Sequence, residues 1–271
     1  MTKDARDNVT LSQGIFIDSI VAGFAGFALS WFITPMDGAV MEKMSGIKPS
    51  IQSSLKDAFK TILTKPIKYA KLPQFGYVFG TYSLSYVAKN YTDTVSYKYS
   101  FTPERTAFYK FWLVFAVNGG LSVFWKDPGL ARIFRNTSKN SVAKSTPMAV
   151  YTSWIMRDSL HMIGAVVMPD YVEQKFGLTE QQWRYCQLSF PMFTQFITTP
   201  FHLMGLDYYN YQNNSDINSQ TRIRLLSRIK RVGSNYFASV ITRCARMFAP
   251  WSIGLLINRD LRNYLMLKVD S

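Results

Sequence analysis

Long apolar stretches alternate with short polar ones along the chain, and several apolar stretches have the length of a membrane-spanning helix. The clearest one extends from Ile15 to Ile33 and holds a single charge, Asp18, so it is long enough to cross the hydrocarbon core of a bilayer. In the stretch Ala22-Gly23-Phe24-Ala25-Gly26, the small residues at positions 22, 23, 25 and 26 would let another helix approach closely. This segment is therefore typical of a membrane-spanning helix that packs against other helices of the same protein.

Two series of spaced residues extend this pattern over the chain. Ala116-Val117-Asn118-Gly119 precedes Pro128 at the spacing by which Gly23 and Gly26 precede Pro35, and a weaker third segment ends at Pro200. A second series places Pro73, Leu160 and Pro250 at nearly even intervals. Interleaving the two series predicts six helices in three pairs. They lie near residues 13–44, 73–92, 107–136, 150–175, 181–211 and 236–266, with kinks expected at Pro35, Pro128 and Pro200.

The connections after the first, third and fifth of these helices are basic. The chain has 31 Lys and Arg against 17 Asp and Glu, a formal charge of +14, and a mean hydropathy of only −0.03. Such a mean fits helices that line a polar centre and are joined by basic loops, which the orientation rule places on one side of the membrane.

Two of the basic connections have the pattern of amphipathic helices. From Pro49 to Leu63, apolar residues recur in steps of four, and from Thr221 to Lys230 they recur in steps of three among cations. This pattern indicates helices that lie on anionic lipid, and we favour it over nucleic-acid binding. The expected lipid-facing cations of the second segment are Arg222, Arg224, Arg228 and Lys230.

The small-residue face followed by Pro35-Met36-Asp37 resembles the mitochondrial carrier family, whose three tandem repeats each carry P-x-[DE]-x-x-[KR]. The resemblance covers nearly the whole chain. It implies a single all-α membrane domain, 1–271, with six transmembrane helices in three pseudo-repeats of about 10–100, 101–178 and 179–271. The helices would surround a central cavity, with short amphipathic helices on the matrix side. It also implies a multi-pass location in the mitochondrial inner membrane.

Most gate charges of that family are replaced in this sequence. At the three proline motifs the acid and base positions hold Asp37 and Val40, Leu130 and Ile133, and His202 and Gly205. At the opposite gate they hold Ser83 and Tyr86, Asp170 and Glu173, and Asp260 and Asn263. Asp37, Asp170 and Asp260 would be remnants of gates that no longer close with ion pairs.

A central substrate site is the other feature that the resemblance implies. Arg157, Asp158 and His161 on the fourth helix, with Arg243 and Arg246 on the sixth, stand near the family's contact points. Charged residues at membrane depth favour a functional role. Two alternatives stay open: Arg157 and Asp158 could pair to tie helices together, and Arg243 and Arg246 could contact lipid phosphate.

The sequence shows no pattern typical of an enzyme or a metal protein. Cys186, Cys244, His161 and His202 have no ligand spacing, and no phosphate loop or nucleophile motif occurs. We therefore expect no enzyme activity, no metal and no cofactor, apart from bound cardiolipin or another anionic phospholipid.

Two functions follow from these expectations. The loss of gate charges favours a degenerate carrier that serves as a structural or accessory subunit of a respiratory-chain complex, such as cytochrome c oxidase, without a normal transport cycle. Its partners would be membrane lipids and other membrane-protein subunits, and no nucleic acid. The alternative is an active, divergent mitochondrial transporter of a small carboxylate or an amino acid, which the central charged residues favour.

Overall fold

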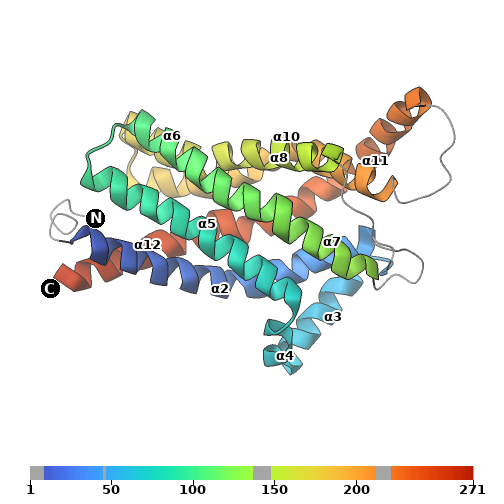
Figure 1. Cartoon of the computed structure of the whole chain (residues 1–271), viewed down its shortest axis with the longest axis horizontal. Coiled ribbons are helices and arrows are strands. Elements are labelled where there is room, and N and C mark those ends of the chain that lie inside the picture. Colours follow the sequence, from blue (N-terminus) through green and yellow to red (C-terminus); the bar gives the residue numbers. More distant parts are fainter. Residues whose placement is uncertain (1–8, 45–46, 137–147, 212–220, 271) are drawn as a thin grey trace.

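The computed structural model describes residues 9–44, 47–136, 148–211 and 221–270, and within these ranges the chain forms helices and no strands (Figure 1). The first four elements are α2 (Leu11–Met44), α3 (Ile51–Thr64), α4 (Pro66–Ala70) and α5 (Pro73–Lys98). The third long segment joins α6 (Pro103–Val114), η1 (Phe115–Gly119), η2 (Ser122–Lys126) and α7 (Asp127–Asn136). The fourth joins α8 (Met148–Met162), η3 (Ile163–Val167) and α9 (Met168–Phe176). Last come α10 (Glu180–Tyr211) and the run α11 (Thr221–Met247), η4 (Phe248–Ile253) and α12 (Gly254–Asp270).

The six predicted helical segments are each helical in the structure. Several boundaries differ by a few residues, and the largest difference is in the sixth segment, which begins at Thr221 and continues to Asp270. The amphipathic stretch expected as a separate interfacial helix is therefore the beginning of α11. Residues 137–147, between the third and fourth long segments, lie outside the described part of the chain.

The amphipathic helix predicted after the first long segment is α3. Ser50 caps its N-terminus, since the Ser50 side chain accepts a hydrogen bond from the amide of Ser53. The helix ends at Thr64, before Pro66, which occupies the first turn of α4. Figure 1 shows α3 and α4 projecting from the side of the bundle, with both chain ends at the opposite end. We call the end that holds both termini the terminal end.

The long segments are positioned by close contacts between helices at glycine residues. A Cβ atom on Gly26 would lie 2.9 Å from the backbone Cα of Ser83, so α2 and α5 meet at this glycine. A Cβ atom on Gly164 would overlap the Thr194 side chain, so the fourth segment and α10 meet in the same way. Around these contacts, Ala22, Ile33, Tyr86 and other buried apolar residues form the largest core cluster.

Within the residues that the structure describes, four widened, π-helical turns interrupt the long helices. η2 directly precedes α7, which holds Pro128 in its first turn, η3 precedes Pro169, and η4 contains Pro250. Proline lacks an amide donor and clashes with the preceding turn, and a widened turn accommodates both effects. Side chains bind carbonyls of these turns: Gln187 donates to Ala165 (3.1 Å) and Trp251 (2.7 Å), and the Tyr86 hydroxyl donates to Pro250. By contrast, α2 and α10 continue as α-helices through Pro35 and Pro200.

Within the described residues, three helical segments are long and apolar enough to cross a membrane: Leu11–Lys43, Pro103–Phe134 and Ser239–Val269. The outer surface of the bundle is rich in exposed aromatic and aliphatic side chains, including Phe16, Phe24, Phe124 and Phe193, while charged side chains are buried inside. Such an arrangement is typical of a membrane protein. The fold is therefore an all-helical membrane fold, whereas the predicted layout of six spans in three pseudo-repeats is not shown.

Candidate functional site

Buried charged side chains gather at two levels along the bundle. The terminal network, near both chain ends, consists of Asp18, Lys89, Asp93, Lys110, Asp170, Glu173, Arg259 and Arg262. The inner network, further along the bundle axis, consists of Asp37, Lys126, Asp127, Arg157, Asp158, Arg243 and Arg246. Because buried charges are costly unless they are paired, each network is a candidate functional site.

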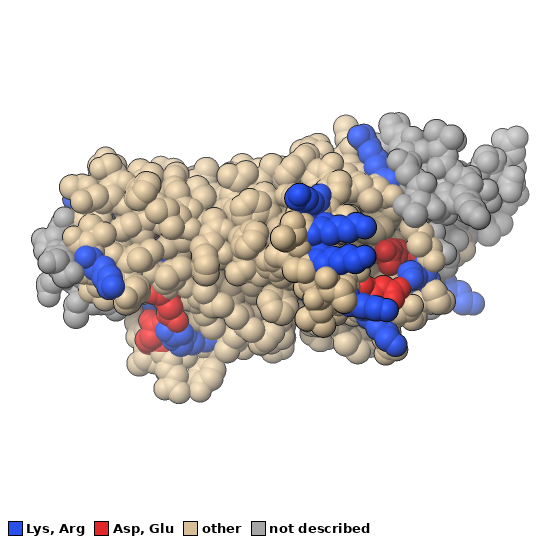
Figure 2. Space-filling view, turned by 90° about the horizontal axis from the view of Figure 1, so that it is seen from below, with Lys and Arg blue, Asp and Glu red and all other residues tan. Residues whose placement is uncertain are grey.

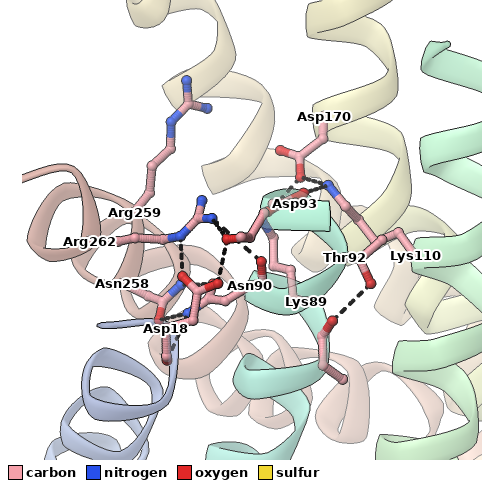
Figure 3. Close-up of polar contacts among 12 residues, drawn as sticks. Asp18, Lys89, Asn90, Thr92, Asp93, Lys110, Asp170, Asn258, Arg259 and Arg262 are labelled. Atoms are coloured by element: carbon pink, nitrogen blue, oxygen red, sulfur yellow. Dashed lines mark hydrogen bonds and ion pairs between the residues drawn. The ribbon is translucent and has the colours of Figure 1, made fainter. Parts of the chain in front are cut away.

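The centre of the terminal network is a ring of two lysines and two aspartates from three segments (Figure 3). The Lys110 ammonium lies 2.5 Å from Asp93 and 2.6 Å from Asp170. Lys89 lies 2.9 Å from Asp93 and 3.1 Å from Asp170. Each cation therefore contacts both anions, and the ring joins α5, α6 and α9.

A second set of contacts ties the first and last segments to α5. Arg262 donates to Asp18 (2.5 Å) and to the hydroxyl of Thr94 (2.6 Å), which in turn donates to Asp18 (2.5 Å). Asn90 and Asn258 donate to each other at 3.1 and 2.7 Å. Figure 3 shows Asp18, Arg262 and the two asparagines beside the lysine-aspartate ring.

The α9, α10 and α12 helices complete this end of the bundle. Arg259 forms two hydrogen bonds to Glu173, at 2.8 and 3.1 Å, and its guanidinium lies 3.7 Å from the centre of the Trp183 ring. The Trp183 indole donates to Asp170 at 2.9 Å. All six long segments thus meet in one polar assembly.

A cavity of about 380 Å³ lies among these groups. Lys89, Lys110 and Arg259 line it together with Asp93 and Glu173. Its volume is in the range of pockets that bind small molecules. Because groups of both signs line it, the cavity suits a ligand that carries both charges.

The inner network is built around Arg157 on α8. Arg157 binds both oxygens of Asp158, at 2.6 and 2.8 Å, and one oxygen of Asp127 at 2.9 Å. Its remaining terminal nitrogen lies 2.9 Å from Nδ1 of His202. A guanidinium can only donate, so His202 accepts through Nδ1 and is neutral.

Asp37 links the first segment to this network. Its carboxylate lies 2.6 Å from Nε of Arg246 and 3.7 Å from the Lys126 ammonium. Lys126 also lies 3.3 Å from Asp127 and faces the ring of Tyr82. The free space among these side chains is only about 10 Å³, so the inner level is closed.

The structure brings together the residues predicted for a central site. Arg157, Asp158, His161, Arg243 and Arg246 all line the small inner cavity. His161 lies further along α8, where its Nδ1 is within 3.1 Å of Thr194 and 3.0 Å of Gln195. Substrate binding by these five residues stays a prediction.

The remnants of the predicted gates are not isolated acids. Asp37 pairs with Arg246, Asp170 with Lys110, and Asp260 with Arg184 at 2.7 Å. The base positions of the predicted gates hold no cation, and the three acids pair with cations from positions outside those gates. Lys89, Lys110, Lys126, Asp127 and Arg262 were missed, although lone charges inside apolar runs are a signal for functional sites.

The predicted lipid-facing cations differ in how exposed their side chains are. Arg228 is buried, pairs with Asp207 at 3.1 Å and lies over the ring of Tyr208, so it does not face lipid. Lys230 is exposed. The side chains of Arg222 and Arg224 lie outside the described part of the chain.

Comparison with known proteins gives one match. A family model described as "Probable citrulline exporter" matches residues 21–266. The chain belongs to this family. No curated protein and no solved structure matches it.

Membership of the citrulline exporter family corrects the resemblance to mitochondrial carriers, which no carrier family model supports. The motif that carried the resemblance combines small residues with a proline, and membrane helices of many families share this combination. The structure also shows that the repeated glycines are not equivalent. Gly26 meets α5, whereas the atoms nearest to a Cβ on Gly119 would be those of the Phe115 ring, in its own segment.

The same finding overturns the expected function. A family of exporters indicates transport, so the interpretation as a mitochondrial carrier-like accessory subunit of a respiratory-chain complex is wrong. That interpretation rested on the loss of gate charges, and the structure supplies paired charges at both levels. Transport and a multi-pass membrane location agree with the family and with the three apolar segments, whereas the mitochondrial inner membrane is not supported.

Proposed function

We propose that the protein exports citrulline, or a closely similar neutral amino acid, across a membrane. The observation that carries this proposal is the family match over residues 21–266. Citrulline carries an ammonium and a carboxylate on one carbon and an uncharged ureido group at the end of its side chain. A passage for it needs charges of both signs and further polar groups, as in the terminal cavity.

We place the passage along the axis of the bundle and infer that all six long segments cross the membrane. Three of them are apolar enough by composition alone. Of the other three, α5 and the α8–α9 run carry buried charges of the two networks, and α10 carries buried glutamines and His202. Charged groups lower the mean hydropathy of a span without facing lipid.

The terminal cavity is the site that we assign to substrate in this conformation. The carboxylate of the amino acid would compete with Asp93 and Asp170 for the lysines of the ring. Its ammonium would compete with those lysines for the same carboxylates. Exchange of partners keeps each buried charge compensated while substrate enters.

The inner network closes the passage below this cavity. Five of the six long segments contribute a charged or histidine side chain to it, and it leaves about 10 Å³ free. Transport would require the inner level to open while the terminal level closes. Substrate drives such a change only by binding one conformation more strongly than the other.

We also propose that anionic phospholipid contacts the basic side of α3 and α4. Phe59, Leu63 and Ile67 are exposed there. Figure 2 shows that Lys and Arg side chains gather on the part of the surface where α3 and α4 project. An apolar strip bordered by cations is typical of a helix at the membrane surface. The lysines are Lys56, Lys60, Lys65 and Lys68.

The test of export is exchange of radiolabelled citrulline by purified protein in liposomes. The informative variant is Lys110→Gln, which removes one cation of the ring, and the matched control is Lys175→Gln. Lys175 is a lysine near the same end that forms an exposed pair with Glu104 at 2.7 Å. We expect the first variant to lower exchange at least tenfold and the second to leave it within about twofold, as is usual for exposed pairs.

Two results would contradict this proposal. Folded wild-type protein that exchanges no citrulline above empty liposomes would remove citrulline as substrate. Equal exchange by the two variants would show that substrate does not pass the lysine-aspartate ring.

A further inference from the structure

One cation of the inner network differs from all others in its surroundings. Arg243 is only 4% exposed, yet it has no hydrogen bond or ion pair to any residue in the described part of the chain, and its Nε and Nη1 atoms are buried without a partner. Arg246, one helical turn away, lies 2.6 Å from Asp37. Two arginines of the same helix, at the same level of the bundle, thus differ in that one has an ion-pair partner and the other has none.

The charge balance of the two networks agrees with this contrast. In the terminal network, four cations face four carboxylates. In the inner network, four cations face three carboxylates. The two nearby histidines add no charge, because His202 accepts from Arg157 and His161 accepts from the Gln195 amide. The inner network therefore has one excess positive charge, at Arg243.

An uncompensated guanidinium in a closed site is unfavourable, and an anion that reaches it removes this cost. Carboxylates are the favoured partners, since the planar guanidinium binds their two oxygens at once. We infer that Arg243 forms an inner subsite for the carboxylate group of the transported amino acid. This inference rests on the proposed function for its ligand, but the missing partner of Arg243 does not depend on it.

The small size of the inner cavity indicates in which conformation this subsite can bind an amino acid. About 10 Å³ of free space holds no more than a water molecule. An amino acid reaches Arg243 only when the inner level opens. Its carboxylate then pairs with Arg243, while its ammonium competes with Arg157 for Asp158. Binding at this subsite thus favours the opened conformation, as substrate-driven opening requires.

Thermal unfolding of the purified full-length protein in detergent tests the subsite without a transport assay. The variants are Arg243→Gln and Arg243→Lys, with Arg246→Gln as the matched control from the same helix. We expect Arg243→Gln to unfold at a higher temperature than wild type when no ligand is present, because it removes an unpaired charge. We expect Arg246→Gln to unfold at a lower temperature, because it leaves Asp37 with only the more distant Lys126.

Ligands then identify what Arg243 binds. Citrulline should raise the unfolding temperature of wild type by several degrees, of Arg243→Lys by less, and of Arg243→Gln not at all. Citrullinamide, in which an amide replaces the carboxylate, should give no shift with wild type. Chloride, compared with gluconate, separates a carboxylate subsite from a site for small inorganic anions.

Three results would overturn the inference: a lower unfolding temperature for Arg243→Gln together with an unchanged response to citrulline, equal shifts with citrulline and citrullinamide, or a chloride shift as large as that with citrulline. These measurements also distinguish a wrong substrate from a wrong subsite. An Arg243-dependent shift with another amino acid, and none with citrulline, would retain the subsite and reject citrulline. No shift with any amino acid of a panel would reject the subsite.

Discussion

The terminal and inner networks consist of the same types of charged side chain, lysine, arginine and carboxylates, in different surroundings. The terminal network encloses a cavity of about 380 Å³ and balances its charges, whereas the inner network leaves about 10 Å³ and has one cation in excess. Ion pairs beside an open cavity can exchange partners with water or substrate. Pairs packed against one another cannot, because each lost partner leaves a buried charge behind. We therefore interpret the first network as an entrance and the second as a closed barrier.

The largest expected effect comes from the closed level. Arg157→Met would remove the cation that holds Asp127 and Asp158, leaving two neighbouring buried carboxylates beside only about 10 Å³ of free space. The expected loss is about 3–5 kcal/mol of unfolding free energy, as for other broken buried pairs. Chemical unfolding followed by tryptophan fluorescence would measure it. A loss below about 1 kcal/mol would show that the inner level is hydrated.

The same kind of substitution at the entrance should cost less. Lys110→Met leaves Asp93 and Asp170 beside Lys89, with the cavity open to water next to them. We expect a loss of about 1–3 kcal/mol, the cost of an incompletely satisfied polar group. Measured beside Arg157→Met in the same assay, an equal or larger loss would remove the distinction between the two networks.

Packing between the two levels gives a third, intermediate effect. Gly26 lies on α2 between Asp18 and Asp37, one from each network, and Gly26→Ala would place a methyl group against the Ser83 backbone. We expect a loss of about 1–2 kcal/mol, as for other overpacked contacts. The matched control is Gly23→Ala, which meets no atom within 4 Å and should be neutral or stabilising. Equal stability of the two variants would contradict this contact.

The smallest effect concerns an exposed pair outside the membrane-spanning segments. Lys48 lies 2.5 Å from Asp57, and its hydrogen bond and charge lower the pKa of the Asp57 carboxyl. This contribution is present above the ordinary pKa of an aspartate and is lost as the pH falls through the lowered pKa. Lys48→Ala should leave the unfolding temperature nearly unchanged at pH 7. A marked change would show that this exposed pair contributes to the stability of the protein.

The helical segments could be predicted because their signal is local. Apolar runs, regular apolar spacing and the prolines predict the six long segments and α3 from neighbouring residues. The continuity of α11 with its amphipathic beginning was missed, since a change of pattern along a helix does not require a break in it.

Several members of the inner network were named from the sequence, but the contacts within both networks could not be predicted, because they join distant parts of the chain. Asp18 and Arg262 are 244 residues apart, and nothing near either residue indicates the other. Both were sought at positions fixed by a resemblance that proved wrong. Arg243 was chosen as a candidate from the sequence, but its lack of a partner is visible only when all of its neighbours are placed.

The widened turns beside Pro128, Pro169 and Pro250 also determine which residues point toward the axis. A widened turn contains one residue more than the α-helical turn that it replaces. Without the widening, the same extra residue would rotate everything beyond it by about 100°, the angle between successive residues of an α-helix. The widened turn η2 therefore keeps Lys126 directed toward Asp37 and Asp127 toward Arg157. Such turns let a helix of this kind hold one residue more beside a proline while its axis-facing side chains stay aligned.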